Sequence, residues 1–126
     1  MQNAIDLAIK GKYTTSPNPN VGCIIAEGNK ILSQSYHCKS GKDHAEVIAL
    51  KNLKKKVNKK MVMYINLEPC CHTGKTGPCT KTIIDSGIKN IEIAMLDTNP
   101  VVKGKGVKEL RKNGINVSIG LCKNEA

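Results

Sequence analysis

The chain has 126 residues and a formal net charge of +10, and 40% of its residues are hydrophobic. A chain of this length is typical of one domain, so we interpret residues 1–126 as a single domain. Its apolar runs are far shorter than the roughly 20 residues that cross a bilayer. No secretory signal pattern opens the chain, so we expect a cytoplasmic domain without a membrane partner.

Helical and strand-like periods of hydrophobicity alternate in the first half of the chain. The pair Gly28-Asn29 is typical of a tight turn between two strands, and Asp43 is well placed to cap the helix that follows. The expected elements are a helix over residues 2–11, a loop over 13–20, strands over 21–26 and 30–36, and a helix over 44–55. The inward face of this last helix should comprise Ala45, Ile48, Ala49 and Leu53.

The second half of the chain continues the same alternation. Residues 54–60 form a lysine-rich connection, which we expect to be a solvated surface. Gly87 and Gly114 are placed to end the two helices that come after it. The expected elements are a strand over residues 61–66, a loop over 67–78, a helix over 79–86, a strand over 91–96, a helix over 104–113 and a strand over 115–119.

The order of these elements predicts an α/β fold. The two strands joined by the tight turn should pair antiparallel, and the strands that follow helical crossovers should lie parallel. Helices on both faces of such a five-stranded mixed sheet form a three-layer α/β/α sandwich. Because ligands bind beyond the carboxyl ends of the strands in open sheets of this kind, we expect the functional site in the loops there.

Two short segments have the residue types of a catalytic zinc site. They are His44-Ala45-Glu46 and Glu68-Pro69-Cys70, the second followed after a loop by Pro78-Cys79. Catalytic zinc takes three protein ligands and leaves a fourth position for water, and His44, Cys70 and Cys79 supply that number. Glu46 lies two residues beyond His44 on a helix, so it points away from the metal and is free to carry a proton. This division of roles is typical of zinc deaminases.

The cysteines and the positive charge leave two other interpretations open. A structural zinc module would use Cys71 or His72 as a fourth ligand, although Glu46 would then have no role. A deaminase of tRNA or single-stranded DNA would attract phosphates with its charge. Against this, the chain has one arginine, Arg111, and only 2% aromatic residues with which to read bases, so we expect no nucleic-acid partner. The cysteines that we expect to be small core residues are Cys23, Cys38 and Cys122.

Longer stretches of the chain resemble the deaminase domain of the bifunctional riboflavin-biosynthesis deaminase/reductase. The matching stretches are residues 16–22 (Ser-Pro-Asn-Pro-Asn-Val-Gly), 44–47 (His-Ala-Glu-Val), 67–76 with Pro78 and Cys79, and 95–100 with Gly104 and Gly106. Eight residues separate Cys70 from Cys79, whereas the generic deaminase motif has two between its cysteines. The longer insertion is a feature of the family that the chain resembles.

The resemblance implies a cytidine deaminase-like fold, a Zn²⁺ cofactor and a pyrimidine ribosyl-phosphate substrate. The family hydrolyses 2,5-diamino-6-ribosylamino-4(3H)-pyrimidinone 5′-phosphate to 5-amino-6-ribosylaminouracil 5′-phosphate and ammonia, with Glu46 in the position of the proton carrier. By the family's pattern, the substrate contacts are Asn18, His37, His72, Lys75, Asp97 and Asn99. The chain has no glycine-rich dinucleotide fingerprint, so we expect no reductase domain, with any reductase on a separate chain. Analogy with other deaminases suggests a homo-oligomer.

Overall fold

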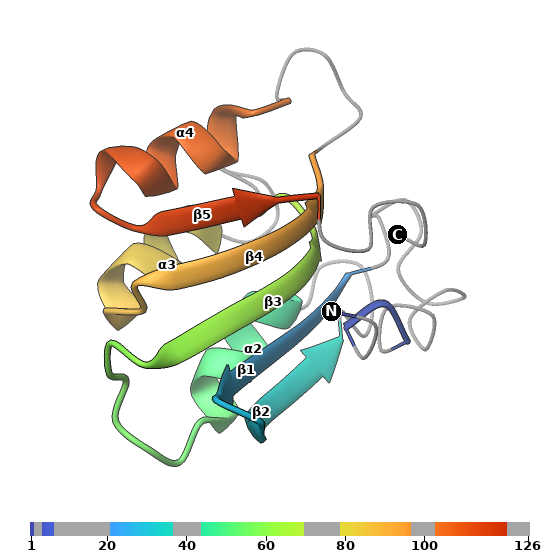
Figure 1. The fold of residues 1–126 in the computed structure, drawn as a ribbon, viewed down its shortest axis with the longest axis vertical. Coiled ribbons are helices and arrows are strands. Elements are labelled where there is room, and N and C mark those ends of the chain that lie inside the picture. Colours follow the sequence, from blue (N-terminus) through green and yellow to red (C-terminus); the bar gives the residue numbers. More distant parts are fainter. Residues whose placement is uncertain (2–3, 7–20, 37–43, 70–78, 97–102, 121–126) are drawn as a thin grey trace.

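The computed structural model describes residues 1, 4–6, 21–36, 44–69, 79–96 and 103–120. Within these ranges strands and helices follow one another in the predicted order (Figure 1). The elements are β1 (Gly22–Glu27), β2 (Lys30–Tyr36), α2 (Ala45–Asn52), β3 (Met61–Leu67), α3 (Cys79–Ser86), β4 (Asn90–Met95), α4 (Lys105–Lys112) and β5 (Asn116–Ile119). Residues 4–6 are also helical, in agreement with the helix expected near the start of the chain. None of the helices in the described ranges is both long and apolar enough to cross a bilayer.

The strands form one mixed sheet in the order β2-β1-β3-β4-β5, which confirms the expected five-stranded sheet. β1 is antiparallel to both of its neighbours, whereas β3, β4 and β5 are parallel to one another. Because β1 alone is reversed, the carboxyl ends of the other strands lie at one edge of the sheet, together with the start of β1. The cross-strand pairs Gly22–Tyr36 and Leu67–Met95 mark this edge.

The tight turn between β1 and β2 is formed by Gly28 and Asn29, as predicted. Gly28 has a φ of 61°, a left-handed conformation that costs glycine no steric strain. The carboxylate of Glu27, just before the turn, accepts hydrogen bonds from Asn58 Nδ2 (2.8 Å) and Lys55 Nζ (3.2 Å), and these bonds lower the pKa of Glu27. The lysine-rich connection is mostly exposed, as expected. The two hydrogen bonds to Glu27 also attach it to this hairpin.

The main hydrophobic core lies between the sheet and the helices α2, α3 and α4. Alternate residues of β1 and β3, such as Ile25 and Ile65, point into it and meet Ile83 of α3 and Leu110 of α4. The buried members are all aliphatic, methionine or cysteine side chains, as the near absence of aromatic residues requires. α3 contacts both α2 and α4, so the three helices cover one face in a row, and Figure 1 shows α2 and α3 behind the sheet.

A smaller cluster covers the opposite face of the sheet. It contains Ala4, from the helical residues 4–6, together with Ile24 and Ala26 of β1. These two β1 residues alternate with those that face the main core, so the strand is buried on both sides. The described helical residues near the start of the chain thus provide the third layer of the predicted sandwich.

Helix α2 is shorter than predicted at its carboxyl end. The hydrophobic pattern predicts a helix over residues 44–55, but α2 spans Ala45–Asn52. His44 is the residue before the first turn and has an extended conformation (φ −70°, ψ 162°), and the expected cap, Asp43, lies outside the described residues. Leu53 is also extended (φ −70°, ψ 119°), so the chain leaves the helix there and enters the lysine-rich connection.

The buried face of α2 also differs in one position from the prediction. Ala45 and Ala49 are buried, and Leu53 packs on the main core, as expected. Ile48 and Leu50 are both half-buried, but of these two only Leu50 packs on the main core. At about 100° per residue, Ile48 lies on the side of the helix away from the buried Glu46, and so on the flank of the buried face.

Replacing Ile65 with alanine should destabilise the fold, because this side chain is 0% exposed in the main core. Truncation removes buried apolar surface and leaves a cavity, so we expect urea denaturation to show a loss of about 2–5 kcal/mol in unfolding free energy. Ile31→Ala is the control, since Ile31 on the edge strand β2 is 44% exposed and should change the value by about 0.5 kcal/mol. Equal losses in the two variants would contradict this assignment of the core.

Candidate active site

The helices α2 and α3 both begin at the sheet edge where the carboxyl ends of the strands meet. α2 follows β2, with His44 just before its first turn, and α3 follows β3 and begins at Cys79. The Nδ1 atom of His44 lies 2.9 Å from the Sγ atom of Cys79, across 35 residues of sequence. Because α2 and α3 contact each other, their packing on the core brings these two predicted metal ligands together.

The His44–Cys79 pair has the donor atoms of a zinc site. With Zn–N near 2.0 Å and Zn–S near 2.3 Å, two tetrahedral ligands hold their donor atoms about 3.5 Å apart. The observed 2.9 Å is somewhat shorter, so a small rotation of either side chain would bring the pair to that separation. An imidazole nitrogen and a cysteine sulfur that converge in a partly buried position therefore fit zinc.

Glu46 lies in the first turn of α2 and is only 3% exposed. It faces the sheet near Cys23 of β1: burial raises the pKa of the Cys23 thiol well above its ordinary value, and the negative charge of Glu46 raises it further. Cys23 itself belongs to the main core, which confirms the prediction that it is a small core residue. A buried carboxylate two residues beyond His44 in the chain is well suited to carry a proton.

The remaining predicted site residues lie outside the described part of the chain. They are the third ligand Cys70 and the expected substrate contacts Asn18, His37, His72, Lys75, Asp97 and Asn99. The same holds for Cys38, Cys71 and Cys122. Within the residues that are described, no three His, Cys, Asp or Glu side chains form a group that could hold a metal ion.

Two serines of β2 hold α2 against the sheet, and sequence reasoning missed both. The Ser35 hydroxyl donates a hydrogen bond to the carbonyl of Ala45, and the Ser33 hydroxyl donates to the carbonyl of Ala49 over 2.6 Å. Ala49 is within the last four residues of the helix, whose carbonyls lack the usual partner four residues on. The only sequence signal was the alternation of the two serines along a strand, which places both on the face toward the helix.

Two polar side chains near the end of β3 bind backbone groups at the same edge, and none of their hydrogen bonds was predicted. Asn66 Oδ1 accepts a hydrogen bond from the backbone N–H of Gly22 at the start of β1 (2.8 Å). The Glu68 carboxylate accepts two, from the N–H groups of Gly104 (2.9 Å) and Val107 (3.0 Å) at the start of α4. The Glu-Pro-Cys segment drew attention to Glu68, but nothing in the sequence indicates which helix it reaches.

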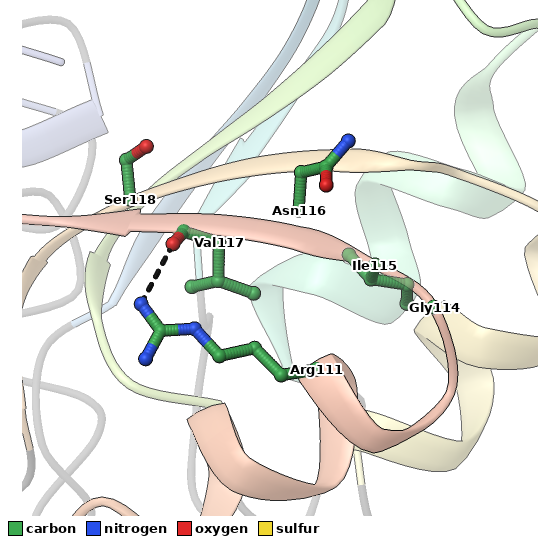
Figure 2. A pocket seen from close by; sticks show the side chains of 6 residues that line it. All are labelled: Arg111, Gly114, Ile115, Asn116, Val117 and Ser118. Carbon is green, nitrogen blue, oxygen red and sulfur yellow. Dashed lines mark hydrogen bonds between the residues drawn. The ribbon is translucent and has the colours of Figure 1, made fainter.

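A pocket beside β5 and the end of α4 holds none of the predicted site residues (Figure 2). It has a volume of about 430 Å³ and is lined by Arg111, Gly114, Ile115, Asn116, Val117 and Ser118. The Arg111 side chain lies in it and donates from Nη2 to the Val117 carbonyl (2.9 Å). The pocket includes the amino end of β5, which lies at the opposite edge of the sheet from the starts of α2 and α3, so it is separate from the candidate active site.

Comparison with known proteins identifies close relatives across the whole chain. The family described as the cytidine and deoxycytidylate deaminase zinc-binding region matches residues 1–95. The chain is 53% identical over 126 residues to the diaminohydroxyphosphoribosylamino-pyrimidine deaminase of Buchnera aphidicola subsp. Schizaphis graminum, covering 100% of this chain and 85% of that relative. It is 49% identical over 126 residues to the riboflavin biosynthesis protein RibD of Aquifex aeolicus, covering 100% of this chain and 35% of RibD.

A solved structure agrees with these relatives. RibD of Acinetobacter baumannii superposes with a TM-score of 0.92 at 42% identity, covering 98% of this chain and 35% of that one. The chain therefore spans 85% of the Buchnera deaminase but about a third of the RibD proteins. These similarities confirm the fold and the resemblance inferred from the sequence.

Replacing Ser33 with alanine should loosen the attachment of α2 to the sheet, because it leaves the buried Ala49 carbonyl without this donor. A lost hydrogen bond with a buried unsatisfied partner costs about 1–3 kcal/mol, which urea denaturation would measure as a lower unfolding free energy. Ser118→Ala is the matched control, since Ser118 is exposed on β5. A Ser33→Ala variant as stable as Ser118→Ala would show that this bond does not hold the helix.

Proposed function

Because the chain belongs to the family of the cytidine and deoxycytidylate deaminase zinc-binding region, we propose that it is the deaminase of riboflavin biosynthesis. It hydrolyses 2,5-diamino-6-ribosylamino-4(3H)-pyrimidinone 5′-phosphate to 5-amino-6-ribosylaminouracil 5′-phosphate and ammonia. The substrate assignment is supported by the Buchnera relative, which is named for this deaminase and shares 53% identity over the whole chain. The observation that carries the chemistry is the convergence of His44 and Cys79, 2.9 Å apart, with the buried Glu46 two residues beyond His44 in the chain.

The proposed metal ligands are His44, Cys70 and Cys79, and the proposed metal is Zn²⁺. The donor set of one imidazole and two thiolates leaves one position open, as a catalytic zinc site requires. When bound, zinc lowers the pKa of a coordinated water enough to make it a nucleophile near neutral pH. The start of α3 favours the thiolate form of Cys79, because the positive end of the helix dipole lies there.

The proposed role of Glu46 is to move protons between water and substrate. Hydrolytic deamination takes a proton from the attacking water and delivers protons to a ring nitrogen and to the leaving amine. A single carboxylate can serve each step if it is close to all three positions and screened from bulk solvent. The burial of Glu46 in the first turn of α2, two residues beyond the proposed metal ligand His44, supports this role.

The proposed substrate contacts are Asn18, His37, His72, Lys75, Asp97 and Asn99. Asn18 belongs to the segment before β1, and the other five belong to the segments that follow β2, β3 and β4. All of these segments attach to the sheet at the edge that contains Gly22 and Leu67, which is also the edge where α2 and α3 begin. This common origin supports their assignment to one site, in which Lys75 is suited to bind the phosphate or a ring oxygen.

The function is tested by ammonia release from the diaminopyrimidine ribosyl-phosphate, measured beside cytidine and a tRNA. We expect rapid release from the diaminopyrimidine phosphate alone, because an active site that hydrogen-bonds one ring rejects rings that leave its polar groups unpaired. Activity confined to the tRNA, with strong dependence on salt, would instead favour the nucleic-acid deaminase. Absence of activity with all three substrates in a zinc-loaded protein would favour a structural zinc module.

Glu46→Gln should nearly abolish ammonia release while leaving zinc binding intact, because glutamine keeps the size of the side chain but cannot carry the proton. Loss of general acid–base catalysis predicts a fall in kcat of about 10²–10⁴-fold. Glu109→Gln is the matched control, since it removes the same charge from an exposed position on α4 and should leave kcat unchanged. Full activity of Glu46→Gln would rule out this mechanism, and loss of zinc from it would mean that Glu46 supports the metal.

A further inference from the structure

The segment that leads into Cys70 is held against the start of α4 by the side chain of Glu68. Glu68 is 6% exposed, and its two carboxylate oxygens accept hydrogen bonds from different N–H groups of that helix. Oε1 accepts from Gly104 (2.9 Å), the residue before the first turn, and Oε2 accepts from Val107 (3.0 Å), the third helical residue. One carboxylate from the end of β3 thus binds the start of a helix that lies 36 residues further along the chain.

In many helices, side chains of the helix itself accept hydrogen bonds from the N–H groups at these two positions. In a capping box, the side chain of the residue before the first turn binds the N–H of the third helical residue, whose own side chain binds back. Gly104 and Val107 have no polar side chain, and the start of α4 has no side-chain cap of its own. Glu68 replaces both halves of the capping box from a distant part of the chain, and its negative charge lies at the positive end of the helix dipole.

Gly106 allows the same segment to approach the helix. A Cβ atom added at Gly106 would lie 2.3 Å from the carbonyl oxygen of Pro69 and 3.1 Å from Cγ of Glu68. A contact of 2.3 Å with a backbone atom cannot be accommodated, so any larger residue would push Pro69 away from α4. Pro69 immediately precedes Cys70, so the position of its carbonyl constrains where Cys70 starts.

We propose that Glu68 and Gly106 form a positioning clamp for the proposed metal ligand Cys70. This inference rests on the proposed function, because it assigns the clamp to the third zinc ligand. Glu68 fixes the direction of the Glu-Pro-Cys segment through two hydrogen bonds, and Gly106 sets its distance from α4. Glu68 therefore acts through Cys70 and does not itself touch the metal or the substrate.

The clamp is tested by zinc affinity, measured with Zn²⁺ in competition with a colorimetric chelator, on the full chain. Glu68→Gln keeps the shape of the side chain but presents an NH₂ group to one of the two N–H donors. Gly106→Ala keeps the carboxylate but fills the space next to Pro69. Residues that orient metal ligands typically change metal affinity by 10–100-fold, so we expect losses of about that size in both variants.

Controls separate positioning from loss of helix stability. Glu109→Gln removes the same charge from an exposed position of α4, and Leu110→Val loosens the buried face of α4 without touching the clamp. Both should bind zinc within about twofold of the parent, because neither contacts the Glu-Pro-Cys segment. Alanine is also a better helix former than glycine by about 1 kcal/mol, so a fall in zinc affinity for Gly106→Ala would not reflect a weaker helix.

The outcomes distinguish failure of the clamp from failure of the proposed function. If the parent and Cys79→Ser bind zinc equally weakly, the zinc site and the clamp are both wrong. If the parent binds zinc tightly and Cys79→Ser does not, but Glu68→Gln and Gly106→Ala match the parent, then only the clamp is overturned and Glu68 merely caps α4. Should Glu68→Gln fail to fold, Gly106→Ala decides the question in the same way.

Discussion

The shared direction of four strands is the constraint on which the candidate site depends. β1 alone is reversed, so β2, β3, β4 and β5 end at one edge of the sheet. Each helix that follows one of these strands therefore begins at that edge. The main core then packs α2 and α3 against each other, and the contact between His44 and Cys79 is the result.

Buried polar side chains connect the helices and strands that meet around the candidate site. Ser35 binds the start of α2, Asn66 binds the start of β1, and Glu68 binds the start of α4. An unpaired backbone group in a buried position costs about 1–3 kcal/mol, so each bond disfavours other placements of its helix or strand. The apolar core supplies most of the driving force for folding, while these bonds determine how the helix starts are arranged around the site.

The helix starts also give this edge its electrostatic character. α2, α3 and α4 all begin there, and the amino end of a helix carries a partial positive charge. Three side chains that can carry a negative charge lie at these helix starts. They are Cys79 at the start of α3, Glu46 in the first turn of α2 and Glu68 at the start of α4. The fold thus favours anionic groups at the edge where a metal cation is proposed, and where an anionic substrate would bind.

The amino-acid sequence by itself determined the strands, the turn at Gly28 and the residue types of the zinc site. Hydrophobic period and glycine placement act between near neighbours, so they can be read along the chain. Only the tertiary structure decided that α2 stops at Asn52, that Ile48 moves to the flank, and that Glu68 caps α4. These features depend on contacts between residues far apart in sequence, such as the 39 positions between Glu68 and Val107, and such contacts exist only once the order of the strands is established.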